Sequence, residues 1–549
     1  MNRTIFLALF FIATNGANLA AQKLHAALWQ DDMVKAKTLA NSPKQLNYAS
    51  SGNGITPLMV VLAKAYLSST DSKQKWPPEI YLSLAQFLLD KGAKLDLRDK
   101  SGKTALHYAV LFNFSGIAIN MLEKGGDATV QDTAGNTLIH YASINGDTLL
   151  LRRLLKNETN INIANHQGLT PLHISIKNKQ TFEAKWLIGQ GADIHAKTKA
   201  DVTPLLMTAQ YGLLEMFDYL LSLGADLSAT SKLGLNALHY AAANGHLEIA
   251  KPLLARGFAL DALTHDHETP LLLALTLKQD TMAIFLLEAG ADPRIASKNG
   301  LTPLHEAAKN GYSEAAIAMM AKGADINAKT PEMQITPLHF AIVGKHTAMA
   351  NLLVAKGADV NFVSGIGTPF WVANLFDQEE ILDSLLAHGA SSFEPIDSTG
   401  EYCSLSAECY EKLAVWHEKQ GNVQPVVENY KLAADWYEKA YTFFHNEKKR
   451  MNRKIFGRAL LNAAFATTAS VAAQYSATQQ AKQYGYGYEK VEYPALSTED
   501  IYAKKFKNMD LEQECSKAAL FCRTAADCYQ NNYDKEAAKR CVELARKDK

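Results

Sequence analysis

The chain has 549 residues, of which 48% are hydrophobic, so it contains enough apolar material for more than one core. Its 56 lysine and arginine residues balance its 56 aspartate and glutamate residues. A balanced charge creates no overall field that favours nucleic acid or an anionic membrane. Composition therefore gives no reason to expect a DNA-binding or RNA-binding protein.

The N-terminus has the pattern of a secretory signal peptide. Arg3 precedes an apolar run at residues 5–13, which is too short to span a bilayer, and Leu19-Ala20-Ala21 offers a cleavage site. We expect residues 1–21 to be removed and the protein to be secreted or periplasmic. The alternatives are a first helix of the following domain, or an uncleaved anchor that would make the protein a membrane-tethered scaffold.

A 33-residue period governs the next part of the chain. One column of this period holds an aliphatic residue in seven successive copies: Leu106, Ile139, Leu172, Leu205, Leu238, Leu271 and Leu304. The next column is mostly histidine, with two leucines: His107, His140, His173, Leu206, His239, Leu272 and His305. A period that persists through seven copies indicates a repeat array.

The letters of one copy predict a pair of helices. Thr302 before Pro303 suits a helix start, because the hydroxyl can cap the helix and proline has no N–H to leave unpaired. A second helix ends at a Gly-Ala-Asp sequence, as at residues 224–226, where glycine supplies the left-handed residue. One such hairpin cannot bury its own apolar face, so the copies must stack.

The Thr-Pro-Leu-His and Gly-Ala-Asp signatures resemble those of ankyrin repeats, over residues 22–391. The resemblance implies an all-α solenoid of about ten helix-turn-helix units, the first and last atypical. It also implies that the finger-like turns and first helices form a concave surface that binds a protein partner. It does not by itself imply catalysis.

One turn position, two residues before a column of glycines, is mostly basic. Stacked units would align it into a ladder that faces an acidic strip on a partner. The partner-binding candidates are Lys100, His166, Lys199, Lys232, His265 and Lys298, with Thr133 in the remaining copy. The alternative is that these are ordinary polar residues of solvated turns. Asp201 and His267 replace the glycine in two copies, so those turns should be strained or differently shaped.

The recurring histidines invite a metal hypothesis, which their spacing disfavours. Neighbouring copies lie about one helix diameter apart, roughly 10 Å, whereas zinc ligands lie about 2 Å from one ion. We therefore expect each imidazole to tie its loop to nearby backbone or threonine groups, and we expect no metal site.

The period ends near residue 391, and a different domain follows. Residues 392–401 are expected to form a linker, and residues 402–549 a second, separate α-helical domain. Two of its stretches, 413–440 and 518–545, resemble tetratricopeptide-type helical hairpins, although a generic helical bundle is an equal alternative. An apolar run at 455–465 follows a basic one, but Arg458 and Asn462 would be costly in hydrocarbon, so membrane contact is not expected.

This second domain contains all six cysteines of the chain. In an oxidising compartment an even number suggests disulfides, and the candidates are Cys403, Cys409, Cys515, Cys522, Cys528 and Cys541. If the last hairpin turns near Asn531-Asn532, Cys522 and Cys541 lie equally far from the bend and should face each other. The alternative is six reduced core thiols in a cytosolic protein.

The sequence contains no Gly-rich phosphate loop, no His-Glu-x-x-His and no Gly-x-Ser-x-Gly. We therefore predict no catalytic residues and no cofactor. The favoured interpretation is an exported scaffold that binds a protein partner, with the second domain as another interaction module, and by analogy a secreted bacterial effector. The alternative is an enzyme whose unrecognised site lies in residues 402–549.

Overall fold

The computed structural model describes residues 23–50, 52–70, 76–156, 160–376, 378–391, 400–420 and 423–447, together with residue 520. The predicted signal peptide and nearly all of the chain after residue 447 lie outside the described residues. The described residues are helical, joined by turns, with one isolated β-bridge between Ser364 and Gly367. The chain divides into two compact units, Met1–Arg256 and Gly257–Lys549, which are taken in turn.

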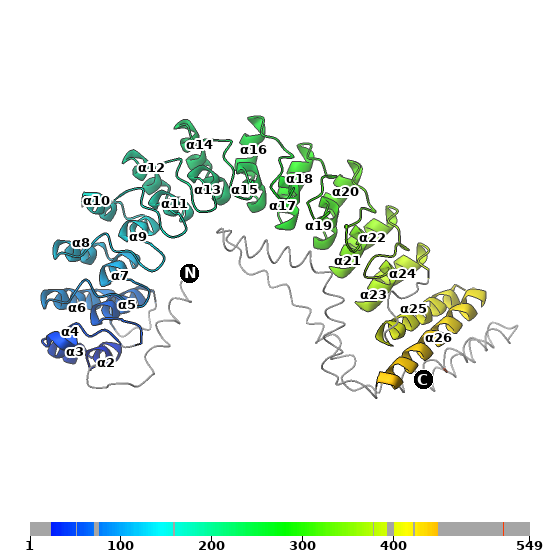
Figure 1. Ribbon diagram of the computed structural model, residues 1–549, viewed down its shortest axis with the longest axis horizontal. Coiled ribbons are helices and arrows are strands. Elements are labelled where there is room, and N and C mark those ends of the chain that lie inside the picture. The colour runs from blue at the N-terminus through cyan, green and yellow to red at the C-terminus, as the bar shows by residue number, and fades with distance from the viewer. Residues whose placement is uncertain are drawn as a thin grey trace. The chain divides into compact units, whose positions relative to one another are not determined.

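The first unit is a series of helical hairpins (Figure 1). Its first helices pack on one another from repeat to repeat (α7 on α9, α9 on α11, α11 on α13, α13 on α15), and so do the second helices α6, α8 and α10. The helices are α2 Lys23–Trp29, α3 Met33–Leu39, α4 Pro43–Leu46, α5 Pro57–Thr70, α6 Pro78–Asp90, α7 Ala105–Leu111, α8 Ser115–Glu123, α9 Leu138–Asn145, α10 Thr148–Lys156, α11 Pro171–Lys177, α12 Thr181–Gly189, α13 Pro204–Tyr211, α14 Leu214–Ser222, α15 Ala237–Asn244 and α16 Leu247–Ala255.

The second unit continues the same hairpin pattern and ends in a pair of longer helices. The helix α25 packs against α23 and α24, and α26 packs along α25, where the Tyr437 hydroxyl donates to the Glu411 carboxylate at 3.0 Å. The helices are α17 Pro270–Thr276, α18 Asp280–Glu288, α19 Pro303–Asn310, α20 Ser313–Ala321, α21 Pro337–Val343, α22 Thr347–Ala355, α23 Pro369–Leu375, α24 Glu379–Ala387, α25 Gly400–Lys419 and α26 Val423–Glu447.

The repeated Thr-Pro pair starts first helices, as predicted. Thr170 has extended backbone angles and its side chain accepts from the His173 N–H, while Pro171 occupies the first helical turn. The glycine of Gly-Ala-Asp is left-handed after each second helix, with φ of 87° at Gly224 and 91° at Gly357. Asp201 and His267, which replace the leading glycine, both have φ of 57°, so two L-residues occupy the left-handed region.

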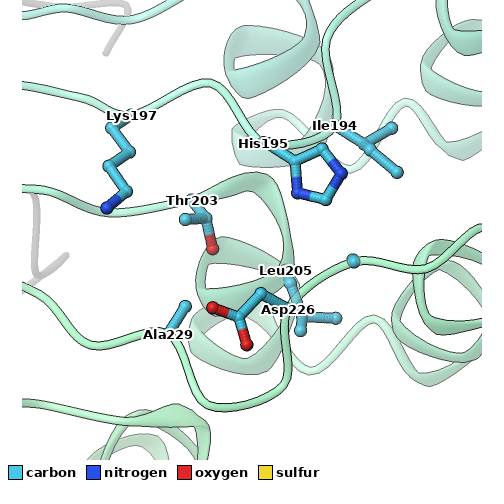
Figure 2. Close-up of a pocket in the computed structure, with 8 residues that line it drawn as sticks. Ile194, His195, Lys197, Thr203, Leu205, Asp226 and Ala229 are labelled. Carbon is cyan, nitrogen blue, oxygen red and sulfur yellow. The ribbon is translucent and has the colours of Figure 1, made fainter.

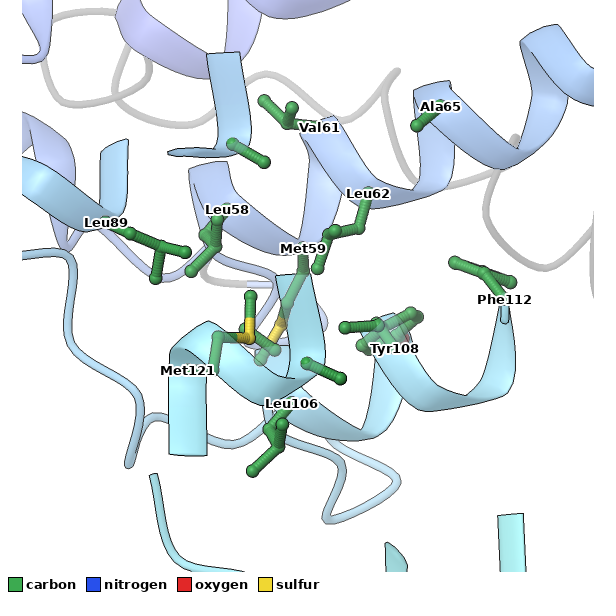
Figure 3. Close-up of a cluster of buried hydrophobic side chains, with 14 of the residues drawn as sticks. Leu58, Met59, Val61, Leu62, Ala65, Leu89, Leu106, Tyr108, Phe112 and Met121 are labelled. Carbon is green, nitrogen blue, oxygen red and sulfur yellow. The ribbon is translucent and has the colours of Figure 1, made fainter. Parts of the chain in front are cut away.

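In the first unit the core runs between the first and second helices of successive repeats. Figure 3 shows one section of it, where Met59 and Leu62 from α5 meet Leu106 from α7 and Met121 from α8. All four side chains are buried. Because each hairpin contributes one narrow apolar stripe, the core grows by addition of repeats, as the 33-residue period predicts.

The N-terminal end of the first unit is closed by a buried polar network with no counterpart in the period. The Lys64 ammonium lies 2.9 Å from the Asp31 carboxylate, and the Tyr81 hydroxyl donates to the same oxygen at 2.6 Å. Lys64 also donates to the Trp29 carbonyl at 3.1 Å. These contacts join the short first helices to α5 and α6, because Lys64 and Tyr81 lie on those two helices.

Candidate binding surface

Several of the recurring histidines tie their repeat to the next one. The His173 Nδ1 accepts from the Thr170 N–H at 3.3 Å, and its Nε2 lies 3.2 Å from the Val202 carbonyl oxygen in the following repeat. Since a carbonyl only accepts, Nε2 must carry the proton. The same arrangement holds for three other repeats, whose Nε2 partners are the carbonyls of Leu169 for His140, Ile335 for His305 and Gly367 for His339. The His107 Nε2 instead bonds to the Val130 carbonyl, in the loop that follows α8.

Burial keeps these imidazoles neutral. Desolvation lowers the pKa of His173 and of His305 from 6.5 to about 4, although the hydrogen bonds to the carbonyls act in the opposite direction. The predicted structural role is thus confirmed: each imidazole ties its loop to threonine and backbone. Within the part of the chain that the structure describes, no group of three or more His, Cys, Asp or Glu side chains is placed to hold a metal ion.

The finger turns of the first unit are joined by a ladder of backbone hydrogen bonds. In each turn the N–H of the predicted ladder residue donates to a carbonyl of the preceding turn. The pairs are Lys100 to Asn53 at 2.8 Å, Thr133 to Ser101 at 2.8 Å, His166 to Ala134 at 2.9 Å, Lys199 to Gln167 at 2.9 Å and Lys232 to Ala200 at 2.9 Å. In the second unit Lys298 donates to Asp266 at 3.0 Å. The backbone therefore holds one such residue per turn in register.

All of the ladder side chains are exposed: Lys100, Thr133, His166, Lys199, Lys232, His265 and Lys298. In the second unit the Lys298 ammonium lies 3.9 Å from the Asp266 carboxylate, which offsets part of its charge. Among the described residues no ion pair involves Lys100, Lys199 or Lys232. The ladder lysines of the first unit are thus exposed without a paired carboxylate in the described part of the chain, although Asp201 lies in the same turn as Lys199.

A polar cluster interrupts the first helices of the second unit. Glu306 lies on α19 at a position that is aromatic or aliphatic in the other repeats, and only 2% of it is exposed. The Lys309 ammonium lies 3.6 Å from its carboxylate, and burial lowers the pKa of Lys309. Burial also raises the pKa of Glu268 to about 7, and the nearby Asp266 and Glu306 carboxylates add to this rise. Neither residue type nor period predicted this cluster.

A small pocket opens beside α13 in the first unit (Figure 2). Thr203 and Leu205 line it from the start of α13, and Ile194, His195, Lys197, Ala225, Asp226 and Ala229 line it from two adjoining turns. Ser228 donates to Asp226 through its hydroxyl and its N–H, at 2.6 and 2.9 Å, and these bonds lower the pKa of Asp226. The carboxylate in the pocket therefore stabilises its own turn.

The repeat geometry agrees with comparisons of the sequence against protein families. The model described as ankyrin repeats (3 copies) matches residues 114–198, 183–262, 205–297, 238–330 and 289–364. The model described as ankyrin repeats (many copies) matches residues 81–124, so the matches together span just over half of the 549 residues. The chain belongs to the ankyrin repeat family. No curated protein matches it.

Ankyrin arrays are protein-interaction scaffolds, so the finger turns and first helices are the surface on which partner binding is expected. In the described residues, no helix is both long and apolar enough to cross a membrane. The ankyrin array places the predicted ladder residues of the first unit together in one row, whereas the Glu268, Glu306 and Lys309 cluster was missed. The signal that could have found Glu306 is the charged residue in an otherwise apolar column.

The cysteines lie beyond the ankyrin array, and the structure describes the side chain of one of them. Cys409 on α25 is a buried free thiol whose pKa is raised by burial, and the Asn374 side chain of α23 bonds to it. Cys403 lies in the same helix with its side chain outside the described residues. Cys515, Cys522, Cys528 and Cys541 are also outside them, as is most of the segment assigned to the enzyme alternative. The disulfide scheme stays a prediction.

Proposed function

We propose that this protein is an exported scaffold that captures a protein partner on the finger turns and first helices of its ankyrin array. The hydrogen-bonded ladder of the first unit is the observation that carries the proposal. It fixes one exposed side chain per repeat in a single row, so a partner meets an ordered surface and does not pay to order separate loops.

The charge of this row defines the partner's chemistry. Lys100, Lys199 and Lys232 are exposed on successive or nearby turns, and the His166 ring between them adds a hydrogen-bonding group. Cations held in a row attract an acidic strip of complementary spacing and speed its encounter with the array. The partner we propose is therefore a protein with a line of carboxylates on its surface.

A charge reversal tests the ladder. The double variant Lys199→Glu and Lys232→Glu should weaken binding of a captured partner by about tenfold or more, because two attractive contacts become repulsive. Isothermal titration calorimetry with the full chain and the partner recovered by affinity capture provides the measurement. Lys322→Glu, which reverses an exposed lysine after α20, serves as the control. Equal affinity of the double variant and the wild type would overturn the proposal.

Export is the second part of the proposal, and the charge and length pattern of residues 1–21 supports it. A secreted bacterial effector that acts on a host is the setting this pattern suggests. Mass spectrometry of the protein from the culture medium should show a mature chain that begins at Gln22. An intact Met1 on protein retained in the cell would contradict export.

A further inference from the structure

Two neighbouring second helices of the first unit expose large apolar side chains to solvent. Leu149 on α10 is 64% exposed and Phe182 on α12 is 67% exposed. Each is the second residue of its helix, so the two occupy equivalent places in successive repeats. The Thr148 hydroxyl donates to the Glu183 carboxylate at 3.2 Å, which links the ends of α10 and α12 next to these side chains.

The rest of the array shows that stacking does not require apolar residues at this place. The equivalent residue of the first repeat is also apolar, Val34 on α3, which is 79% exposed. In the later repeats the equivalent residues are small or polar: Gly116, Glu215, Glu248, Thr281, Glu314, Ala348 and Glu380. Leu149 and Phe182 therefore depart from the repeat pattern at two adjacent positions, and each exposes an apolar surface that water solvates poorly. Two exposed apolar side chains at equivalent places in neighbouring repeats indicate a contact surface, whereas a single one would not.

The same two helices carry an excess of positive charge. Four cations, Arg152, Arg153, Lys156 and Lys185, stand against the single carboxylate of Glu183. Arg153 pairs with Glu123 of α8 at 3.2 Å, and Lys185 pairs with Glu215 of α14. Arg152 lies over the Trp186 ring at 5.8 Å, and among the described residues neither Arg152 nor Lys156 forms an ion pair. Both are exposed, and they lie three and seven residues after Leu149, on the same face of α10.

We propose that the outer face of α10 and α12 is a second docking site, which binds an acidic amphipathic helix of a protein partner. The partner's apolar stripe would cover Leu149 and Phe182, and its flanking carboxylates would meet Arg152 and Lys156. This site lies on second helices, so it is separate from the finger ladder and does not depend on it. Exposed Glu123 and Glu215 border the patch on both sides, which favours a narrow helix over a broad anionic bilayer.

A labelled synthetic helix tests the site. The probe is a fluorescein-labelled peptide of leucine and glutamate with leucines at helical spacing, and fluorescence anisotropy with the full chain measures its binding. The double variant Leu149→Ser and Phe182→Ser should weaken binding about tenfold or more, as should the single variant Lys156→Glu. The matched control is Ile317→Ser on α20, which removes an apolar side chain that is 48% exposed in the other unit. It should leave binding unchanged.

Three outcomes would overturn the proposal: no binding of the leucine-glutamate peptide, equal binding of a leucine-lysine peptide, or recovery of the chain on phosphatidylserine-containing vesicles with no peptide binding. Variants that melt at the wild-type temperature show that a loss of binding is not a loss of folding. The ladder variant Lys199→Glu and Lys232→Glu should bind the peptide as the wild type does, so failure of one site is distinguishable from failure of the other.

Discussion

Repeats of the ankyrin array begin their first helices with different side chains. In α11 the third helical residue is His173, which reaches the next repeat, and Gly168 leads the turn before it. In α13 the corresponding residues are Leu206 and Asp201, and in α17 they are Leu272 and His267. The threonine cap is present in both kinds of repeat, since Thr203 and Thr269 accept from the N–H groups of the leucines. The cap therefore suffices to start a helix, and the imidazole is an added link between repeats.

Acidification should give the largest difference in stability between the repeats that carry the histidine and those that carry leucine. The unfolded imidazole titrates at 6.5, whereas burial lowers the pKa of His107, His173, His305 and His339 to about 4. Between these values the unfolded chain binds more protons, so stability present above pH 6.5 is lost as the pH falls toward 4. Each unit of pKa corresponds to about 1.4 kcal/mol, so several histidines together exceed any single substitution.

Hydrogen exchange followed by mass spectrometry at pH 7 and pH 5 measures this loss. Peptides from α11 and α19 should lose protection before those from α13. The pKa of Glu268 is shifted in the opposite direction, from the usual 4.5 up to about 7. Its contribution to folding stability therefore declines as the pH rises from 4.5 to 7. A Glu268→Gln variant removes this opposing term and should steepen the acid response. Equal loss of protection in all first helices would contradict the assignment.

Replacing one histidine gives the next largest effect. His173→Leu copies the leucine repeats, but it leaves the Thr170 N–H buried without its Nδ1 acceptor, which should cost about 2–3 kcal/mol at pH 7. The Val202 carbonyl keeps the N–H of Thr198 at 3.1 Å, so it is not orphaned. Urea unfolding should show the change, and His166→Leu on an exposed turn is the control. A cost below about 0.5 kcal/mol would mean that the link contributes little to stability.

The glycines of two turns differ in how closely other atoms approach them. Gly168 has φ of 77°, and a Cβ there would lie 2.6 Å from the Lys199 nitrogen, which is part of the finger ladder. Gly168→Ala should cost about 2 kcal/mol, since it adds a clash to a strained backbone. Gly191→Ala, at φ of 94° with no atom within 4 Å of the new Cβ, carries the strain alone and should cost about 1 kcal/mol. Thermal unfolding of both variants sharpens the comparison, and equal costs would show that no clash occurs.

Installing the missing histidine should have the smallest effect. Leu206→His places an imidazole where Thr203 already caps α13, and we expect a change of less than about 1 kcal/mol at pH 7, since buried apolar area is exchanged for a hydrogen bond. The variant should acquire the acid sensitivity that α11 has. Hydrogen exchange of α13 at pH 5 is the measurement, and an unchanged pH response would show that this junction has no site for the ring.

Much of the array could be predicted because the helix starts and ends of each repeat are determined by nearby residues. Thr170 and Pro171 start a helix and Gly224 ends one for reasons contained in a few neighbouring residues, and the 33-residue spacing does the rest. The link made by His173 followed from distance alone, since neighbouring imidazoles are too far apart to share an ion. The polar residues 68–70 gave no such local signal, yet α5 extends through them to Thr70, because a helix can continue through polar residues that need no burial.

Features that join non-equivalent positions could not be predicted. Asp31, Lys64 and Tyr81 form a network at the N-terminal end although no period relates them. Leu149 follows Thr148 at the start of a run of three leucines, and only the packing of α10 shows which of the three faces solvent. The partner-binding role of Lys199 and Lys232 depends on a second molecule. The sequence of one chain therefore predicts the row of ladder residues but not the protein that binds to it.

The links made by His140, His173, His305 and His339 run in the same direction along the chain. Each of these four Nε2 atoms donates to a carbonyl of the repeat that follows, as His140 does to Leu169, whereas the His246 Nε2 bonds back to the Gln210 carbonyl of the preceding repeat. During synthesis every such repeat leaves one donor unsatisfied until its successor has emerged and folded. Truncation on the C-terminal side of one of these four repeats therefore leaves its imidazole without an acceptor, whereas truncation on the N-terminal side removes only a donor to a carbonyl. The array should consequently assemble vectorially and fray from its later end.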